Sequence, residues 1–228
     1  MQKLALNVPG IDSLLGGGLE PEIITTVYGA SGCGKTNFAL QAVLSCIKSG
    51  KKAVFIDPEG SFSVERYLQI HTKEGLENVI LYSPKTFEEQ AKAIAETAKI
   101  SKTDRVGLIV VDSIVALYRI HTHEADVANA NSMLSKQFAE LSMIAREHKI
   151  PVLVTNKVYS DFDSGELELV GRDIPKYSSR CLIHLERASG TRRKATIIKH
   201  RSQPEGGSTE FLIKNEGLVD AGKKFGLF

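Results

Sequence analysis

The chain has 228 residues, enough for one large α/β domain over residues 1–228 but too few for two domains of ordinary size. Its 29 basic and 27 acidic side chains give a net charge of +2, which argues neither for nor against a polyanionic partner, so only local clusters of charge can inform. Because the three cysteines form no CxxC pair and no apolar run reaches the roughly 18 to 20 residues of a membrane span, we expect a soluble cytoplasmic protein without a zinc site, disulfides or a membrane partner.

Short β-rich runs alternate with helical patterns through the first two thirds of the chain. Five strands are expected, at residues 23–28, 52–57, 79–83, 105–112 and 150–155. Helices are expected between them, at residues 36–50, 86–100 and about 126–148, and the second opens with a capping box at Thr86 and Glu89. This alternation predicts a mostly parallel central sheet with helices on both faces.

The pattern changes after residue 178. Two β-rich segments follow, at residues 181–201 and 208–215, and the first of them contains a turn at residues 188–191. They predict two or three antiparallel strands added at an edge of the sheet. Because no Pro/Ser-rich linker or internal repeat interrupts the chain, we expect no domain boundary.

The most specific motif is "YGASGCGKT", which matches G-x-x-x-x-G-K-[ST] between a predicted strand and a predicted helix. Glycines in such a loop let successive backbone N–H groups point at phosphates, and the dipole of the following helix adds to the attraction. Lys35 would neutralise the β- and γ-phosphate oxygens, and Thr36 would hold Mg²⁺. The predicted nucleotide-binding residues are Gly29, Ala30, Ser31, Gly32, Cys33, Gly34, Lys35, Thr36 and Asn37.

Two carboxylates are expected at the same edge of the sheet as this loop. Asp112 ends the apolar run "LIVVD", so it is either a carboxylate that helps to bind Mg²⁺ or a plain strand terminator. Glu59 follows the strand that ends at Asp57. It is either the group that orients or deprotonates an attacking water, or a cap for a helix that begins near Ser61.

Several motifs, in this order along the chain, resemble the RecA-type recombinases, and most closely the short archaeal paralogues of RadA. The stretch "FIDPEGSFSVERY" resembles the family's strand, catalytic glutamate and adenine-side arginine. The stretches "VVDSIVALYR" and "VLVTNKV" resemble the strands that lead into its first and second DNA loops. The resemblance covers nearly the whole chain, and it implies a RecA-like P-loop NTPase core that binds ATP and Mg²⁺ and acts in homologous recombination and DNA repair.

The resemblance also implies roles for individual residues. By position, Glu59 becomes the water-activating carboxylate, and Lys35 is the other catalytic residue. Arg66 becomes an adenine-stacking side chain, a role that suits a flat guanidinium. Lys157 stands in the nucleotide site where the larger recombinases have a glutamine that senses the γ-phosphate, and a lysine there would act as a fixed point charge. We therefore expect weak coupling between ATP and DNA.

A second departure from the larger recombinases lies at the start of the chain. Only 28 residues precede Gly29, so we expect neither their helical DNA-binding domain nor the linker that docks the next protomer. Filament growth by that route is not expected.

The two segments that correspond to DNA loops are poor in positive charge. The first, residues 118–131, holds Arg119 against Glu124 and Asp126. The second, residues 157–177, has three basic residues against five acidic ones. Because affinity for DNA depends on neutralising its phosphates with Lys and Arg, neither segment is suited to the task.

A basic run without acids follows at residues 187–201. We predict nonspecific DNA contacts there, and the alternative is an edge hairpin whose charges prevent strand pairing. The proposed DNA contacts are Arg187, Arg192, Arg193 and Lys194. Farther along, Lys199 and Arg201 resemble the family's Lys-x-Lys/Arg pair, which contacts the γ-phosphate bound by a neighbouring subunit. Residues two positions apart on a strand point to the same side of the sheet. The pair implies a homo-oligomer, unless it belongs to the DNA-facing patch.

The sequence thus predicts an ATP-binding, weakly ATP-hydrolysing and DNA-binding accessory protein of homologous recombination and repair. The resemblance implies that it does not exchange strands itself, that it regulates the processing of branched DNA, and that RadA and a Holliday-junction resolvase are its partners. Two alternatives remain open. One is a filament-forming strand-exchange recombinase, and the other is a ring-forming RecA-like ATPase outside recombination.

Overall fold

The computed structural model describes residues 2–70, 75–124, 126–160 and 167–222. The helices within these ranges are α1 (Pro9–Leu14), α2 (Lys35–Lys48), α3 (Val64–Ile70), α4 (Phe87–Thr103), α5 (Ala116–Glu124), α6 (Val127–His148) and α7 (Asp173–Ser178), with a 3-10 turn at Leu76–Asn78. The strands are β1 (Ile24–Gly29), β2 (Lys52–Ile56), β3 (Val79–Tyr82), β4 (Val106–Val111), β5 (Val152–Ser160), β6 (Leu167–Leu169), β7 (Cys181–Arg187), β8 (Arg192–Lys199), β9 (Ser208–Lys214) and β10 (Gly217–Asp220).

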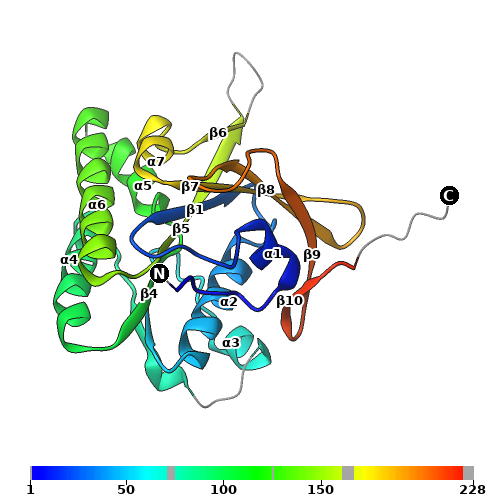
Figure 1. The fold of residues 1–228 in the computed structure, drawn as a ribbon. Coiled ribbons are helices and arrows are strands. Elements are labelled where there is room, and N and C mark those ends of the chain that lie inside the picture. The colour runs from blue at the N-terminus through cyan, green and yellow to red at the C-terminus, as the bar shows by residue number, and fades with distance from the viewer. Residues whose placement is uncertain (1, 71–74, 125, 161–166, 223–228) are drawn as a thin grey trace.

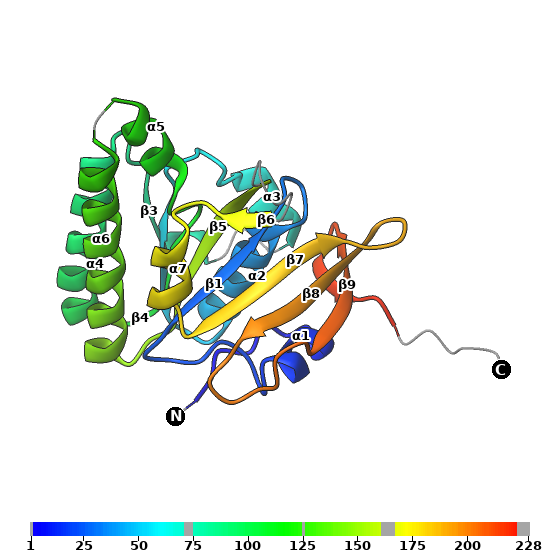
Figure 2. The same cartoon turned by 90° about the horizontal axis from the view of Figure 1, so that it is seen from above.

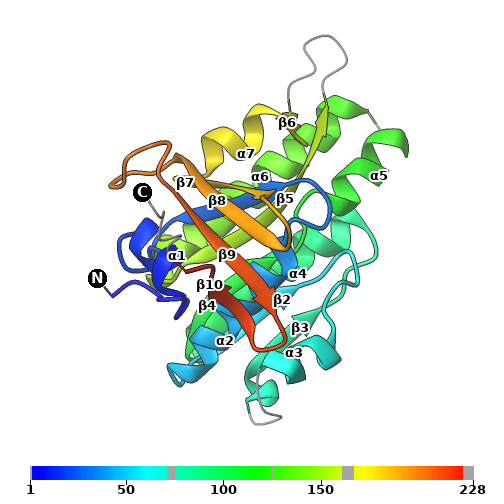
Figure 3. The same cartoon turned by 90° about the vertical axis from the view of Figure 1, so that its right-hand side faces the viewer.

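The strands form one sheet in the order β10-β9-β8-β7-β1-β5-β4-β2-β3, with β6 paired to β5 outside this path. The run from β7 to β3 is parallel, whereas β7, β8, β9 and β10 pair antiparallel and extend one edge (Figures 2 and 3). This topology confirms the predicted mostly parallel sheet with antiparallel C-terminal additions. The sequence indicated two or three of these added strands, and the short β10 is a further one.

Helices cover both faces of the sheet because the parallel strands are apolar on both sides. Along β2, Ala53 and Phe55 belong to one hydrophobic core, and the alternate residues Val54 and Ile56 belong to the other. The first core lies under α2, and the second lies under α4 and α6, which stand together on the opposite face (Figure 1). The strand ends between the two helical layers therefore form an edge that is open to a ligand.

The caps of the two long helices agree with the sequence pattern. Thr86 Oγ1 accepts a hydrogen bond of 3.1 Å from Glu89 N at the start of α4. The Glu89 carboxylate bonds the backbone N of Lys85 at 2.7 Å, one residue earlier than in an ideal capping box. Asp126 caps α6 by accepting from Ala128 N at 3.2 Å.

Phe138 on α6 offers a test of the second core. The side chain is 0% exposed, so Phe138→Ala is expected to lower the free energy of unfolding by about 3–5 kcal/mol through lost burial and a cavity. Met143 on the same helix is 55% exposed, and Met143→Ala is expected to stay within about 0.5 kcal/mol of the wild type. Urea denaturation measures both values. Equal losses in the two variants would contradict this assignment of the buried face.

Candidate functional site

The glycine-rich loop at residues 29–36 joins β1 to α2, as the sequence predicted. Gly34 is the N-cap of α2 with φ of 106°, and it supplies no side-chain cap to the first turn. The backbone N–H groups of that turn are therefore available to an anion. Gly29 passes so close to β7 that an added Cβ would lie 2.1 Å from the carbonyl oxygen of Leu185. Only glycine fits there, which fixes the loop against the sheet.

Lys35 is buried at the mouth of this loop. Its Nζ donates hydrogen bonds of 2.8 Å to the carbonyl oxygens of Gly29 and Ala30. The ammonium is thus held over the loop by two neutral acceptors, and it has no carboxylate partner among the described residues. Phosphate oxygens are stronger partners for an ammonium than carbonyls are, so the group is placed to receive them.

Asp112 is a buried carboxylate at the end of β4. Thr155 Oγ1 donates to its Oδ1, Ser61 Oγ donates to its Oδ2 at 3.2 Å, and the Thr36 hydroxyl also hydrogen-bonds to it. Burial raises the pKa of Asp112 despite the hydroxyl donors, and the nearby charge of Glu59 raises it further. This carboxylate lacks a full counter-charge, and a cation beside it would supply one.

Glu59 lies in a turn that Asp57 holds in place. The Asp57 carboxylate accepts hydrogen bonds of 2.8 Å from the backbone N–H groups of Ser61 and Phe62. Asp57, not Glu59, therefore orders the approach to α3. The Glu59 side chain instead turns into the site, where its Oε2 lies 2.8 Å from Nζ of Lys157 on β5. The interpretation of Glu59 as a helix cap is wrong because Ser63 Oγ accepts from Arg66 N at 3.1 Å in the first turn of α3.

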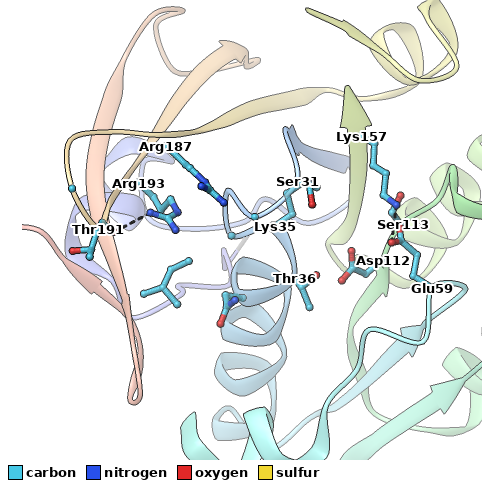
Figure 4. A pocket seen from close by; sticks show the side chains of 15 residues that line it. Ser31, Lys35, Thr36, Glu59, Asp112, Ser113, Lys157, Arg187, Thr191 and Arg193 are labelled. Carbon is cyan, nitrogen blue, oxygen red and sulfur yellow. Dashed lines mark hydrogen bonds and ion pairs between the residues drawn. The ribbon is translucent and has the colours of Figure 1, made fainter. Parts of the chain in front are cut away.

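These groups line a cavity of about 610 Å³ between the loop and the strand ends (Figure 4). The predicted site residues that line it are Ser31, Gly32, Gly34, Lys35, Thr36, Asn37, Glu59, Asp112 and Lys157. Three further predicted residues do not line the cavity: Gly29 and Ala30 contribute the carbonyl oxygens that accept from Lys35, and Cys33 is buried. The structure therefore brings most of the predicted nucleotide site together.

Arg66 stands beside the cavity and contacts one of its lining residues. Its Nε donates to Asn37 Oδ1 at 2.8 Å, and its guanidinium also donates to the backbone carbonyls of Lys214 at 2.7 Å and Asn215 at 3.2 Å. These bonds hold the guanidinium between α2 and the turn from β9 to β10. Its proposed contact with adenine stays a prediction, and this position suits a base that leaves the cavity past Asn37.

Lys199 and Arg201 do not share a strand, which corrects the sequence interpretation. The strand β8 ends at Lys199, and Arg201 lies in the bend that follows. Lys199 Nζ donates to the carbonyl oxygens of Lys176 at 2.9 Å and Ser179 at 2.8 Å. Arg201 pairs with the buried carboxylate of Glu20. Neither side chain lines the cavity, so their proposed role at a neighbouring subunit stays a prediction.

The expected first DNA loop is largely helical. Residues 118–131 fall in α5 and in the first turns of α6, apart from a short break between them. In the second segment, β5 continues to Ser160 and pairs antiparallel with β6, and α7 follows. The acids Asp161, Asp163 and Glu166 of this segment lie outside the described residues. The charges of these two segments therefore did not predict α5, α7 or the pairing of β5 with β6.

The basic run at residues 187–201 is divided between the two faces of the hairpin formed by β7 and β8. Arg192 pairs with Glu210 at 2.9 Å, and Lys194 pairs with Glu186 at 3.3 Å. Arg187 and Arg193 instead line the cavity, together with Gly190 and Thr191 of the turn. The basic run by itself did not predict that these two arginines line the candidate site, and the signal that could have revealed it is the two-residue alternation of a strand.

The residues of this site fit Mg²⁺. Thr36 supplies a hydroxyl and Asp112 supplies a desolvated carboxylate, and the two side chains are in hydrogen-bond contact. Among the described residues, no cluster of three or more His, Cys, Asp or Glu side chains could hold a metal by itself. Magnesium needs few protein ligands when phosphates complete its shell. In the same described part of the chain, no helix is long and apolar enough to cross a membrane.

Comparisons with known proteins agree with this geometry. A family model described as Rad51 matches residues 3–221. The chain is 41% identical over 221 residues to the DNA repair and recombination protein RadB of Methanococcoides burtonii, which covers 95% of this chain and 97% of that protein. It is 38% identical over 221 residues to the RadB of Thermoplasma volcanium, covering 96% of this chain and 92% of that protein.

A solved structure gives the same result for the fold. The crystal structure of the RadB recombinase superposes with a TM-score of 0.80 at 34% sequence identity, over 96% of this chain and 100% of that one. The resemblance to RecA-type recombinases that the sequence motifs indicated is therefore confirmed, and so is the RecA-like fold.

The buried charge of Asp112 leads to a prediction about stability. Because its pKa is raised on folding, its ionisation costs folding free energy as pH rises from the unfolded value of about 3.9 through the folded one. Asp112→Asn keeps the oxygen that accepts from Thr155 and removes the charge. Without Mg²⁺ or nucleotide, we expect a gain of about 0.5–2 kcal/mol in unfolding free energy at pH 7, and a vanishing gain near pH 4.

The same variant should lose the increase in nucleotide affinity that Mg²⁺ produces, as calorimetric titration would measure. The matched control is Asp104→Asn, at a half-exposed carboxylate that pairs with Lys52 away from the cavity. Its stability is expected to stay equal or fall slightly. A loss of stability in Asp112→Asn at pH 7 would contradict the assignment of an undercompensated charge.

Proposed function

Because the chain belongs to the Rad51 family and, within it, to the RadB proteins, we propose that it is an ATP-binding and DNA-binding accessory protein that hydrolyses ATP slowly and does not exchange strands itself. Its place in a family of recombination and repair proteins rests on the relatives described above. The slow hydrolysis rests on one observation. Lys157 Nζ lies 2.8 Å from Glu59 Oε2, so the carboxylate that would activate water is already engaged.

The ion pair opposes hydrolysis because it engages the carboxylate that would act as the base. A general base must accept a hydrogen bond from the attacking water. Among the described residues, the carboxylates that line the cavity are Glu59 and the buried Asp112. Lys157 occupies one oxygen of Glu59. Lys157 thereby acts on the base itself, whereas a neutral side chain at this position would leave Glu59 free.

The other residues would bind and orient ATP. Lys35 would exchange its two carbonyl partners for oxygens of the β- and γ-phosphates. Thr36 and Asp112 would hold Mg²⁺, which screens phosphate charge when it is bound. Arg66 would lie against the adenine, on the side where it already contacts Asn37. Each of these groups is supplied by the same subunit.

DNA and protein partners complete the proposal. We place nonspecific DNA contacts on the outer face of the hairpin, at Arg192 and Lys194, where each basic side chain is also paired with an acid. Such pairing predicts modest affinity that falls with salt. RadA and a Holliday-junction resolvase are the proposed protein partners, with branched DNA as the shared substrate. We treat residues 1–228 as one domain, and Lys199 and Arg201 as the candidate contacts of a homo-oligomer.

The ion pair between Lys157 and Glu59 can be tested by turnover. The Lys157 side chain is 39% exposed, so after solvent screening we expect Lys157→Gln to release about 0.5–1 kcal/mol of restraint and to raise kcat about two- to fivefold. Glu59→Gln should abolish turnover in either background. The matched control is Lys52→Gln, because Lys52 is 37% exposed and pairs with Asp104 at 2.7 Å outside the cavity. An unchanged kcat in Lys157→Gln would refute the restraint.

The absence of strand exchange needs a separate measurement. ATP turnover and strand exchange should be followed together, with and without single-stranded DNA, on the wild type and on Lys157→Gln. We expect low turnover, little stimulation by DNA and no exchanged product from the wild type. High DNA-stimulated turnover with exchange would instead favour a filament-forming recombinase. A closed ring seen by native mass measurement only with ATP would favour a ring-forming ATPase.

A further inference from the structure

The hairpin formed by β7 and β8 places two arginines directly opposite each other. Arg187 on β7 is the register partner of Arg193 on β8. Directly opposed residues of an antiparallel pair point to the same face of the sheet. Leu185 and Phe211 share that face and belong to the core beneath α2. The two guanidinium groups therefore emerge on the side of the glycine-rich loop.

This arrangement is unfavourable by itself, because like charges directly opposite one another destabilise a strand pair. Within the described part of the chain, the Arg187 guanidinium makes no hydrogen bond or ion pair, although the backbone of Arg187 belongs to the β7–β8 ladder. Arg193 donates only to the backbone carbonyls of Thr191 at 3.0 Å and Arg192 at 3.1 Å, and its buried Nε has no partner. The charges of this inner pair are thus uncompensated within the described structure.

The outer face of the same hairpin is different. Arg192 and Lys194, which alternate with Arg193 along β8, are each paired with a glutamate. The chain therefore neutralises the basic side chains that face away from the cavity and leaves the two that face it without an acid. The contrast within one strand argues against a general accumulation of positive charge on an edge hairpin.

The inner pair lies at the nucleotide cavity. Both arginines line it together with Lys35, and a Cβ added to Gly32 of the loop would lie 2.5 Å from Arg187 Nη2 (Figure 4). Four basic side chains line the cavity against the two acidic ones, Glu59 and Asp112. The excess is positive even after Lys157 is paired with Glu59. A polyphosphate would balance it, and a guanidinium binds phosphate oxygens with two parallel hydrogen bonds.

We propose that Arg187 and Arg193 bind the phosphate chain of the nucleotide held by the same subunit. This inference rests on the proposed ATP site and deepens it, because it assigns the nucleotide two phosphate ligands from the C-terminal hairpin in addition to the glycine-rich loop. The ligand relieves the repulsion between the opposed arginines and links the hairpin to α2. The hairpin then serves two ligands, with phosphates of the nucleotide inside and any DNA phosphates outside.

The first test compares inner and outer variants of the hairpin. Affinities for Mg-ATP, Mg-ADP and adenosine are measured by calorimetry on Arg187→Gln and Arg193→Gln, with Arg192→Gln and Lys194→Gln as matched controls. Each inner variant is expected to bind Mg-ATP about tenfold or more weakly, since a charge-assisted contact to phosphate is lost. Adenosine should bind every variant as it binds the wild type. The outer variants should bind Mg-ATP normally.

The second test measures thermal stability, and it also shows whether each variant is folded. Without nucleotide, Arg193→Gln is expected to raise Tm by about 1–2 °C because the repulsion is removed. The increase in Tm on adding Mg-ATP should shrink in both inner variants and persist in both outer ones. Arg187→Lys and Arg193→Lys keep the charge without the planar fork, and they should recover part of the affinity.

The possible outcomes separate this inference from the function on which it rests. A wild-type protein that bound no Mg-ATP would overturn the proposed function and this inference with it. A wild type that binds Mg-ATP while the inner variants bind it equally tightly would overturn only the inference. Inner variants that lose affinity for single-stranded DNA but not for Mg-ATP would also overturn it, and would assign the whole hairpin to DNA.

Discussion

The buried carboxylate of Asp112 is the constraint around which the site is arranged. A desolvated charge must be surrounded by donors, and here the donors are hydroxyls of Thr155, Ser61 and Thr36. They come from β5, from the turn after β2 and from the start of α2. The ends of three neighbouring strands and the first turn of a helix must therefore converge on one point. Neutral hydroxyls compensate the charge only in part, which is why the same carboxylate suits Mg²⁺.

The remaining charges of the cavity are distributed unevenly around this centre. On the side of β5, Lys157 and Glu59 compensate one another. On the side of the C-terminal hairpin, Arg187 and Arg193 have no acid between them. The side of the cavity with the proposed catalytic carboxylate is thus internally balanced, and the opposite side carries positive charge without an acid. Such a distribution agrees with the proposed slow hydrolysis, because a bound nucleotide would meet unsatisfied donors whereas the proposed water-activating group is already paired.

How much of this could be read from the sequence depends on how local each signal is. The loop at residues 29–36 was predictable because its strand, glycines and helix are contiguous. Asp112 was predictable as well, since the carboxyl ends of parallel strands share one edge. The pair of Lys157 with Glu59 was not, because it joins residues 98 positions apart through a turn that Asp57 orders. Nor did the charges of residues 118–131 reveal that apolar packing of α5 against α6 makes most of that segment helical.

The prediction that the basic residues of the hairpin share one DNA-facing surface was incomplete for a related reason. A run of like charges gives no indication of which members face which way until the register with the partner strand is known. The register that sets Arg187 opposite Arg193 puts Glu186 opposite Lys194 at the same time. The same register therefore places the unpaired Arg187 and Arg193 on the cavity side of the hairpin and pairs Lys194 with Glu186 on the opposite side.

Lys157 also connects the cavity to the segment that stands in place of the second DNA loop. Its side chain meets Glu59, while its backbone carbonyl accepts a hydrogen bond of 3.0 Å from Val170 N, just beyond β6. From there Glu168 pairs with Lys176 on α7, and Lys199 Nζ on β8 donates a hydrogen bond to the carbonyl oxygen of Ser179, the C-cap residue of α7. A ligand that draws Lys157 away from Glu59 would therefore pull on a strand already tied to α7 and β8. Any coupling between a ligand in the cavity and this surface would therefore run through Lys157, whose partner in this structure is Glu59, the proposed water-activating carboxylate.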